Sequence, residues 1–217
     1  MGVWDTVGAL GVPVPFMGTL GEEKFLFHDA MPSSIVKHAR HAIAIDEFRE
    51  DFLPSPWYRD EPEGNNTIRR RFNPDKPDIK QVWFAGAHAD IGGGYVETGL
   101  SDIALKWMVD EAAKYGLRFE THLKTSIAPD HSGQMHNEYK GWFKVLRPGA
   151  VREMLPHART DPKGKVRSVR VDPTDVIVHP TVKQRWQANV DGYRESPALD
   201  KLLRANGGGW AGIKLWA

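Results

Sequence analysis

The stretch VWFAGAHADIGGGY, residues 82–95, decides how this chain folds. A short apolar run over residues 81–84 predicts a buried strand, and a loop of small residues follows it. That loop carries His88 and Asp90 and ends in the glycines Gly92–Gly94. A histidine just past the carboxyl end of a strand is well placed to be a general base. Three consecutive glycines could form a phosphate-binding loop, but the run lacks the Lys-Ser/Thr of a Walker loop and the full dinucleotide fingerprint. A backbone that requires positive φ angles explains these glycines more simply.

The amino-terminal segment GVWDT, residues 2–6, has the same design and ends its strand in Asp5. In Ser-His-acid enzymes the acid holds the imidazole tautomer, while the imidazole takes the proton of the nucleophile. Asp5 and His88 are 83 positions apart, in the order acid then histidine. This spacing predicts an acid–base pair. It is equally compatible with an Asp5 that caps a turn and a His88 that is an ordinary loop residue.

The nucleophile that such a pair needs is missing from the sequence. A nucleophilic serine on a sharp elbow has the pattern Gly-x-Ser-x-Gly, which does not occur here. Ser101 comes nearest, but position 103 is isoleucine and Ser101 is better explained as a helix cap. The remaining serines that we considered lie in polar or proline-flanked settings: Ser33, Ser34, Ser126 and Ser132.

Composition narrows the class of protein. The 217 residues are 41% hydrophobic and 26% charged, which is typical of one globular domain. A net charge of +1 argues against broad nucleic-acid binding. The absence of cysteine excludes disulfides and thiolate sites. No apolar run approaches the roughly 20 residues of a transmembrane segment, and the first residues do not resemble a Sec signal.

The order of predicted elements favours an α/β layer fold. Residues 1–4 read as a strand, residues 33–42 as a helix and residues 42–46 as a further strand-like run. The clearest helix covers residues 101–114 and ends before Gly116.

The rest of the chain is expected to be less regular. Five prolines predict a mostly irregular segment over residues 52–77. The region from about residue 124 is loop-rich, with candidate strands at 166–171 and 176–178 and a helix at 181–190. We therefore divide the chain into a domain over 1–195 and a loose tail over 196–217.

Other polar residues give weaker signals. His38 and His41 are spaced to share a metal on a helix, yet packing roles explain them more simply. Asp46 follows a β-like run and is either a cap or a ligand, and His179 is a lesser rival of His88. The polar-loop histidines at 131 and 136 are expected to be solvated. We predict no cofactor and no metal.

Three segments together resemble a known family: GVWDTVGALGVP (2–13), ARHAIAIDEFREDFLP (39–54) and VWFAGAHADIGGGYVETGLSDIALKWMVDEA (82–112). It is an α/β-hydrolase domain family that includes phospholipase effectors of bacterial type VI secretion. The resemblance covers roughly residues 2–115, and IVHPTVKQRW (177–186) is similar to a later family element. It implies that Asp5 is the catalytic acid and His88 the base, and we infer that Asp90 supports the His88 loop.

The resemblance also implies a lipid or acyl-ester substrate and a secretion apparatus as partner. It implies a protein of the bacterial cytoplasm that type VI secretion delivers, and it implies no nucleic acid or transmembrane segment. In the family, the elbow serine precedes the Trp-Asp-Thr segment, with which this sequence begins. We therefore expect the C-terminal part of an α/β-hydrolase-like domain, with a partial layered sheet, a loop-rich C-terminal region and no activity alone.

Two alternatives remain open. One is half of a split lipase whose serine lies on a complementing chain. The other is a non-catalytic binding or immunity-like module, which would tolerate Asp5→Asn. An incomplete parallel sheet exposes an edge and apolar faces, so we also expect partial disorder, self-association or a need for a partner.

Overall fold

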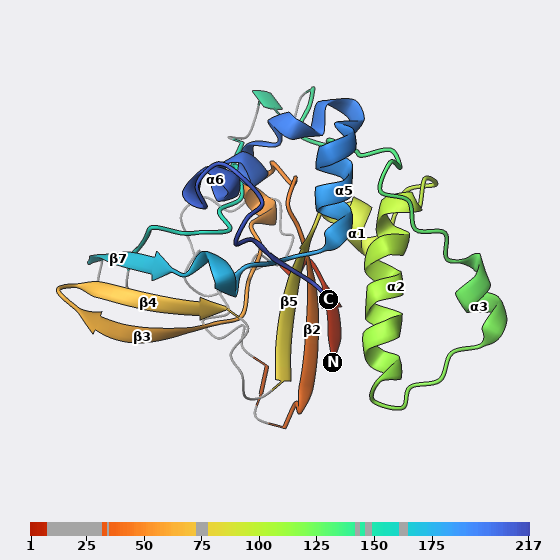
Figure 1. Cartoon of the computed structure of the whole chain (residues 1–217), viewed down its shortest axis with the longest axis horizontal. Coiled ribbons are helices and arrows are strands. Elements are labelled where there is room, and N and C mark those ends of the chain that lie inside the picture. The colour runs from red at the N-terminus through yellow and green to blue at the C-terminus, as the bar shows by residue number, and fades with distance from the viewer. Residues whose placement is uncertain (8–31, 34, 73–77, 142–143, 146–148, 161–164) are drawn as a thin grey trace.

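The computed structural model describes residues 1–7, 32–33, 35–72, 78–141, 144–145, 149–160 and 165–217. Its main sheet has five parallel strands in the order β1-β2-β5-β8-β9 (Figure 1). Their bounds are Gly2–Trp4, His38–Ala44, Asp78–Phe84, Ile177–Val178 and Lys214–Leu215. Because all five run the same way, their carboxyl ends meet at one edge of the sheet.

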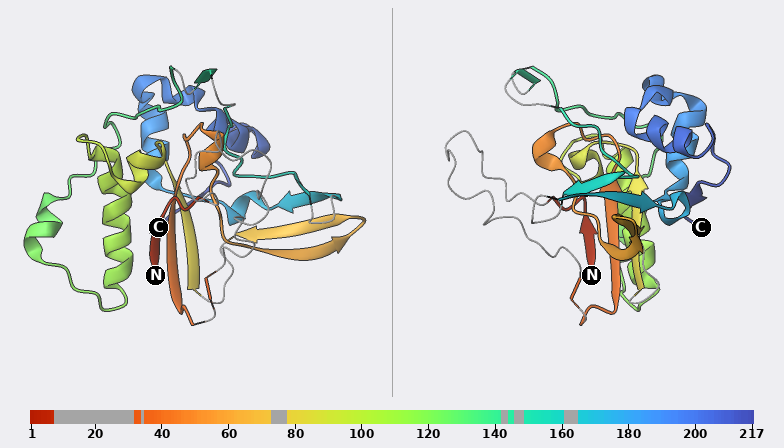
Figure 2. Two further views of the ribbon diagram at one scale, coloured as in Figure 1. Left: turned by 180° about the vertical axis from the view of Figure 1, so that it is seen from behind. Right: turned by 90° about the vertical axis from the view of Figure 1, so that its left-hand side faces the viewer.

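Helices cover both faces of this sheet (Figures 1 and 2). On one face, Phe84 of β5 packs with Ile103 and Trp107 of α2 (Gly99–Ala113). On the other face, Trp83 packs with residues of α5 (Pro180–Ala188) and α6 (Pro197–Ala205). The α/β class and the helix predicted at 101–114 are confirmed, while the specific hydrolase topology stays a prediction.

The helix predicted over residues 33–42 is wrong, because strand β2 begins at His38. Ala39 to Ala44 are all buried, and their partners in β5 lie in register from His38↔Asp78 to Ala44↔Phe84. A strand buried on both faces has no alternation of polar and apolar residues, so its sequence resembles a buried helix.

A second sheet projects from the opposite side to α2 and has the order β3-β4-β7-β6. Its strands are Tyr58–Gly64, Thr67–Phe72, Val166–Val171 and Ala158–Thr160. The irregular segment predicted over 52–77 is therefore wrong for β3 and β4. The register of β3 shifts between Pro62 and Gly64, and the turn at Asn65 and Asn66 has positive φ angles. This hairpin accommodates its proline at the irregularity of the ladder.

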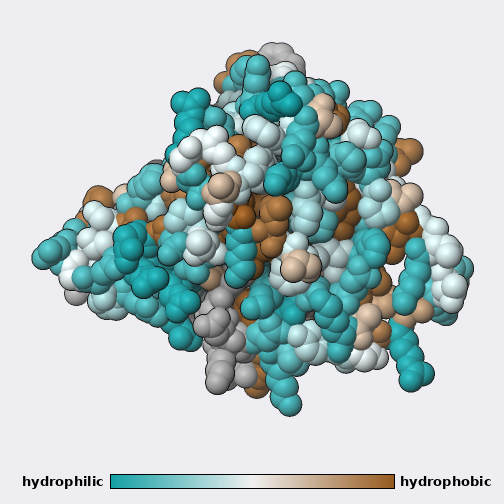
Figure 3. All heavy atoms as spheres, in the orientation of Figure 1, coloured by the Kyte–Doolittle hydropathy of each residue, from teal (hydrophilic) through white to brown (hydrophobic). Residues whose placement is uncertain are grey.

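Short helices complete the described structure. They are α1 (His88–Gly92), α3 (Thr121–Ser126) and the 3-10 helices Glu50–Phe52, Pro173–Asp175 and Val190–Glu195. Among the described helices, none is long and apolar enough to cross a membrane. The face seen in Figure 3 is mostly hydrophilic, with apolar residues gathered near its middle.

The segment 196–217, expected to be a loose tail, is packed instead. It contains α6 and β9, and Leu199, Leu202 and Ile213 are buried in the core. The apolar residues of α6 recur at helical spacing on one face, and that face lies on the main sheet. The glycines at 207–209 obscured this packing in the sequence. The boundary at residue 195 stays a prediction.

Candidate active site at the carboxyl edge of the main sheet

Asp5 lies just past the carboxyl end of β1, with its side chain fully buried. Its backbone has a φ of +41°, which is uncommon for a residue other than glycine. Its N–H donates to the Ala42 carbonyl at 2.7 Å, and its Oδ1 accepts from the Ala44 N–H at 2.9 Å. Strained backbone of this kind persists where the surrounding structure holds it, often at functional sites.

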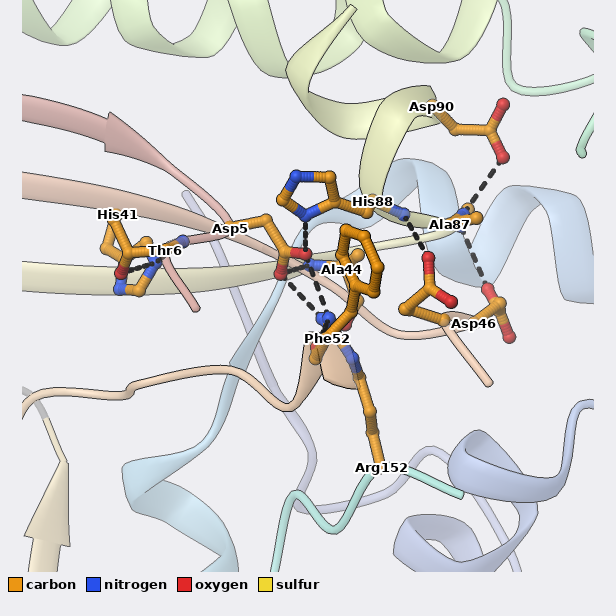
Figure 4. A network of polar contacts seen from close by, with 12 residues as sticks. Asp5, Thr6, His41, Ala44, Asp46, Phe52, Ala87, His88, Asp90 and Arg152 are labelled. Atoms are coloured by element: carbon orange, nitrogen blue, oxygen red, sulfur yellow. Dashed lines mark hydrogen bonds and ion pairs between the residues drawn. The ribbon is translucent and has the colours of Figure 1, made fainter. Parts of the chain in front are cut away.

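His88 is the first residue of α1, directly after the turn that follows β5. Its Nδ1 lies 2.7 Å from Asp5 Oδ2 (Figure 4). The structure thus brings together the two residues singled out by the sequence. Because an ionised carboxylate can only accept, Nδ1 carries a proton, and the neutral form of this ring has its free lone pair on Nε2. The His88 side chain is 32% exposed, and within the described residues its Nε2 has no hydrogen-bond partner.

Arg152 also contacts the acid, and sequence reasoning missed it. Its side chain is fully buried and holds both carboxylate oxygens of Asp5, from Nη1 to Oδ1 at 2.5 Å and from Nη2 to Oδ2 at 2.9 Å. Burial alone would raise the pKa of Asp5, but hydrogen bonds from His88 and Arg152 and the Arg152 charge lower that pKa below its usual value. No sequence signal separated Arg152 from the other arginines.

Glu47, at the carboxyl end of β2, supports the backbone of His88. Its Oε2 accepts from the His88 N–H at 3.2 Å, and Arg49 binds both of its oxygens at 2.8 and 2.9 Å. Burial would raise the pKa of Glu47, but the hydrogen bonds and charge of Arg49 lower it. The Phe52 ring packs edge-on against the imidazole of His88, with ring centroids 5.1 Å apart.

Asp90 sits inside α1 and holds the turn before His88. Its Oδ2 accepts from the Ala87 N–H at 2.9 Å, and its Oδ1 lies 2.7 Å from Nδ1 of His136. Gly86, in this turn, has a φ of +127°, and a Cβ there would lie 2.6 Å from Asp90 Cβ. Asp90 therefore has contacts suited to a supporting role, and His136 is one of its partners rather than a solvated loop residue. Gly93 and Gly94 have the positive φ angles expected of them, but the prediction is wrong for Gly92, which is the last residue of α1.

Asp46 is buried and serves the same turn. Its oxygens accept from the Gly86 N–H at 2.9 Å, the Tyr193 hydroxyl at 2.9 Å and the Ser196 hydroxyl at 2.6 Å. Burial raises the pKa of Asp46. Among the described residues, no group of three or more acidic, histidine or cysteine side chains could hold a metal ion.

The remaining histidine candidates are not hydrogen-bonded to Asp5 or His88, although the charge of Asp5 acts on the pKa of His41. His41 is buried in β2, where its Nε2 accepts from the Thr6 N–H at 3.1 Å. His179 caps α5 and stacks on Phe84. His38 lies at the exposed start of β2, so it does not share a helix face with His41. The backbone carbonyl of His131 accepts from Arg185.

The arrangement is an imidazole oriented by a buried, ionised acid, in a side chain that is partly exposed. It can accept a proton from a hydroxyl placed next to Nε2. Ser101, the serine nearest to the elbow pattern, lies within α2 and donates to the Thr98 carbonyl at 3.0 Å instead. In the part of the chain that the structure describes, no serine is hydrogen-bonded to His88.

Comparison with known proteins adds an independent finding. The family model described as "T6SS, phospholipase effector Tle1-like, catalytic domain" matches residues 1–111, which include Asp5, His88 and Asp90. The uncharacterized protein YEL023C of Saccharomyces cerevisiae is 36% identical over 61 residues. That match covers 26% of this chain and 9% of the yeast protein. No solved structure matches the chain.

Proposed function

The chain belongs to the family of Tle1-like phospholipase effector catalytic domains of the type VI secretion system, and on this premise we propose that it supplies the acid and the base of a serine-type lipid esterase. The substrate class is acyl esters of phospholipids. The observation that carries the proposal is the hydrogen bond of 2.7 Å between His88 Nδ1 and the buried carboxylate of Asp5. It leaves Nε2 free and partly exposed, as a general base requires.

In this proposal, each residue has a defined step. His88 Nε2 removes the proton of the attacking hydroxyl and later donates it to the leaving alkoxide. Asp5 stays ionised, keeps the imidazole in the tautomer with a proton on Nδ1, and stabilises the imidazolium that forms. Asp90 and Glu47 hold the backbone on which His88 is mounted, through the Ala87 and His88 N–H groups.

We propose that the nucleophilic serine comes from a segment outside these 217 residues, on the same polypeptide or another one. The sequence contains no Gly-x-Ser-x-Gly elbow, and the hydrogen bonds of His88 to described residues go to Asp5 and Glu47. Loss of the nucleophile leaves at most roughly 10³–10⁴-fold acceleration over water in enzymes of this kind. The chain alone is therefore inactive in this proposal.

The outer edge of β1 is where we propose that this segment docks. β1 is an edge strand of the main sheet as described. Parallel sheets are normally buried, and natural proteins protect the edges of their sheets. Beside it lies a groove of about 670 Å³ between β1 and α2. Nine large apolar side chains of the described residues are exposed, and five of them line this groove: Met1, Ile35, Leu105, Tyr115 and Leu117. Exposed apolar groups gathered in one place mark an interaction surface.

The occupant that fits this surface is a strand followed by a helix. A strand paired parallel to β1 would have its carboxyl end next to the carboxyl end of β1, which Asp5 follows. The residue after that strand would therefore lie near His88 Nε2. The helix would lie in the apolar groove. A serine in the turn between this strand and this helix would complete the site, and the added strand would cover the unpaired side of β1.

Hydrolysis of a short-chain p-nitrophenyl ester tests the proposal. The chain alone should show no more hydrolysis than its His88→Ala variant. Co-expression with the candidate serine-bearing segment should restore hydrolysis of the ester and of phosphatidylcholine vesicles. His88→Ala should abolish the restored activity, while the matched change at an exposed histidine, His122→Ala, should leave it intact.

Two results would contradict the proposal. One is hydrolysis by the chain alone that His88→Ala removes, because the nucleophile would then lie within it. The other is restored activity that does not depend on His88.

Delivery by type VI secretion is part of the same proposal. It predicts that a neighbouring cell acquires the chain only when the producing cell has a working apparatus.

A further inference from the structure

Arg152 contacts both oxygens of the acid, yet it lies outside the residues that the family model matches. We propose that Arg152 is a positioning residue, which fixes the plane of the Asp5 carboxylate so that Oδ2 points at His88 Nδ1. This inference rests on the proposed function, because it assigns a role within that site.

The geometry of the contact is that of a clamp. Asp5 Oδ1 accepts from the Ala44 N–H and Arg152 Nη1, and Oδ2 accepts from His88 Nδ1 and Arg152 Nη2. Each oxygen therefore has one guanidinium contact and one further donor. A planar guanidinium that binds both oxygens fixes the orientation of a carboxylate, whereas a single ammonium supplies a point charge.

Arg152 also ties the acid to the wall beside the imidazole. Nη1 donates to the Ala44 carbonyl at 2.7 Å, and Nη2 donates to the Phe52 carbonyl at 2.5 Å. The Phe52 ring is the one that packs against His88. One side chain thus links the end of β2, the acid and the residue that restricts the imidazole ring.

The backbone that carries Arg152 is held close to this point. Ala150 N–H donates to the Phe48 carbonyl at 2.8 Å, and Gly149 forms a bridge with Arg49. Met154, two residues after Arg152, is buried. The guanidinium is therefore anchored through the backbone contacts of its own segment as well as through its hydrogen bonds.

Charge and geometry can be separated by two variants. Arg152→Met removes both, while Arg152→Lys keeps a positive charge without the planar pair of donors. Arg185→Met is the matched control, because Arg185 is also fully buried and also bonds two carbonyls and a carboxylate, namely those of His131, Gly133 and Asp191. It does not touch the acid–imidazole pair.

The readout is the proton magnetic resonance signal of the His88 Nδ1–H, which a strong hydrogen bond to a carboxylate moves far downfield. It is assigned by its absence in His88→Gln. We expect the signal in the unmodified chain and in Arg185→Met, and its loss in both Arg152→Met and Arg152→Lys. Retention in Arg152→Met, retention in Arg152→Lys, or loss in Arg185→Met would each overturn the positioning role.

A second measurement covers the case in which an Arg152 variant does not fold. In the unmodified chain, the Nη protons of Arg152 should exchange with water far more slowly than those of Arg204, whose side chain is 78% exposed. Equal exchange would overturn the proposal. Neither readout needs catalysis. If both measurements support the positioning role of Arg152 but the complemented protein does not hydrolyse the ester, the proposed function is refuted and the positioning role is not.

Discussion

At the scale of single residues, the site depends on one buried carboxylate that serves two partners. Asp5 is an ionised group without exposed surface, and it faces the guanidinium of Arg152 and the imidazole of His88. A buried charge is tolerated only when it is paired and hydrogen-bonded. The acid therefore contributes to folding as well as to the proposed chemistry.

Asp5→Asn should destabilise the chain strongly. The substitution leaves the Arg152 charge buried without its counter-charge, and breaking a buried pair in this way costs about 3–5 kcal/mol. Denaturant unfolding measures the loss. Asp110→Asn is the control, because Asp110 pairs with Lys106 on the surface and both side chains are 56% exposed, so we expect a change within about 0.5 kcal/mol. Tolerance of Asp5→Asn would favour the non-catalytic module instead.

Two neutral histidines should make stability depend on pH. Burial lowers the pKa of His41 to about 4 and that of His179 to about 4, from an ordinary value of 6.5. Between these values the unfolded chain binds more protons than the folded one. Their contribution is therefore full above pH 6.5 and is lost as the pH falls toward 4, on the order of 2–3 kcal/mol for each.

Unfolding free energies measured from pH 7 to pH 4.5 test this dependence. His41→Gln should remove part of the slope, whereas His122→Gln should leave it unchanged, because the His122 side chain is 72% exposed. A slope that is the same in both variants would contradict the assignment to His41.

At the scale of elements, the turn between β5 and α1 fixes the position of His88, the proposed base, beyond the carboxyl end of the strand. Gly86 and Asp90 pack so closely in this turn that there is no room for a Cβ at position 86. Asp46 accepts from the Gly86 N–H, so the end of β2 holds the same turn. The position of His88 thus depends on strand β5, on Gly86 and on the carboxylates of Asp46 and Asp90.

Gly86→Ala should displace α1 and lower stability. Its Cβ would meet Asp90 at 2.6 Å and would also require a φ of +127°, so we expect a loss of about 2–4 kcal/mol. Gly116→Ala is the control, because that residue has a positive φ but nothing within 4 Å, and it should lose only about 1 kcal/mol. Thermal unfolding measures both. Equal losses would mean that contact with Asp90 plays no part.

Sequence patterns predicted the elements that carry their own local signals. The strand before His88 and the helix after Gly99 were predictable from an apolar run and from caps. Strand β2 was not, because burial on both faces removes the alternation. Asp5 and His88 could be paired because each follows a strand. Arg152 could not, since a contact between residues 147 positions apart depends on tertiary structure.

At the scale of the whole molecule, the main sheet is covered on both faces but ends at β1 beside an apolar groove. We predict that the chain alone self-associates through this surface. Leu117→Glu combined with Ile35→Glu should shift it toward the monomer in sedimentation experiments. Val96→Glu is the control, because Val96 is 94% exposed and lies away from the groove. A clean monomer with cooperative melting would contradict the prediction.

The contacts that close the site also set when it can form during synthesis. Asp5 meets Arg152, and Asp46 meets Tyr193 and Ser196, across 147 to 150 positions of sequence. A ribosome adds about 5–20 residues per second, so roughly 7–30 s separate the emergence of these partners. The nascent chain therefore carries Asp5 without its guanidinium partner until Arg152 has been synthesised.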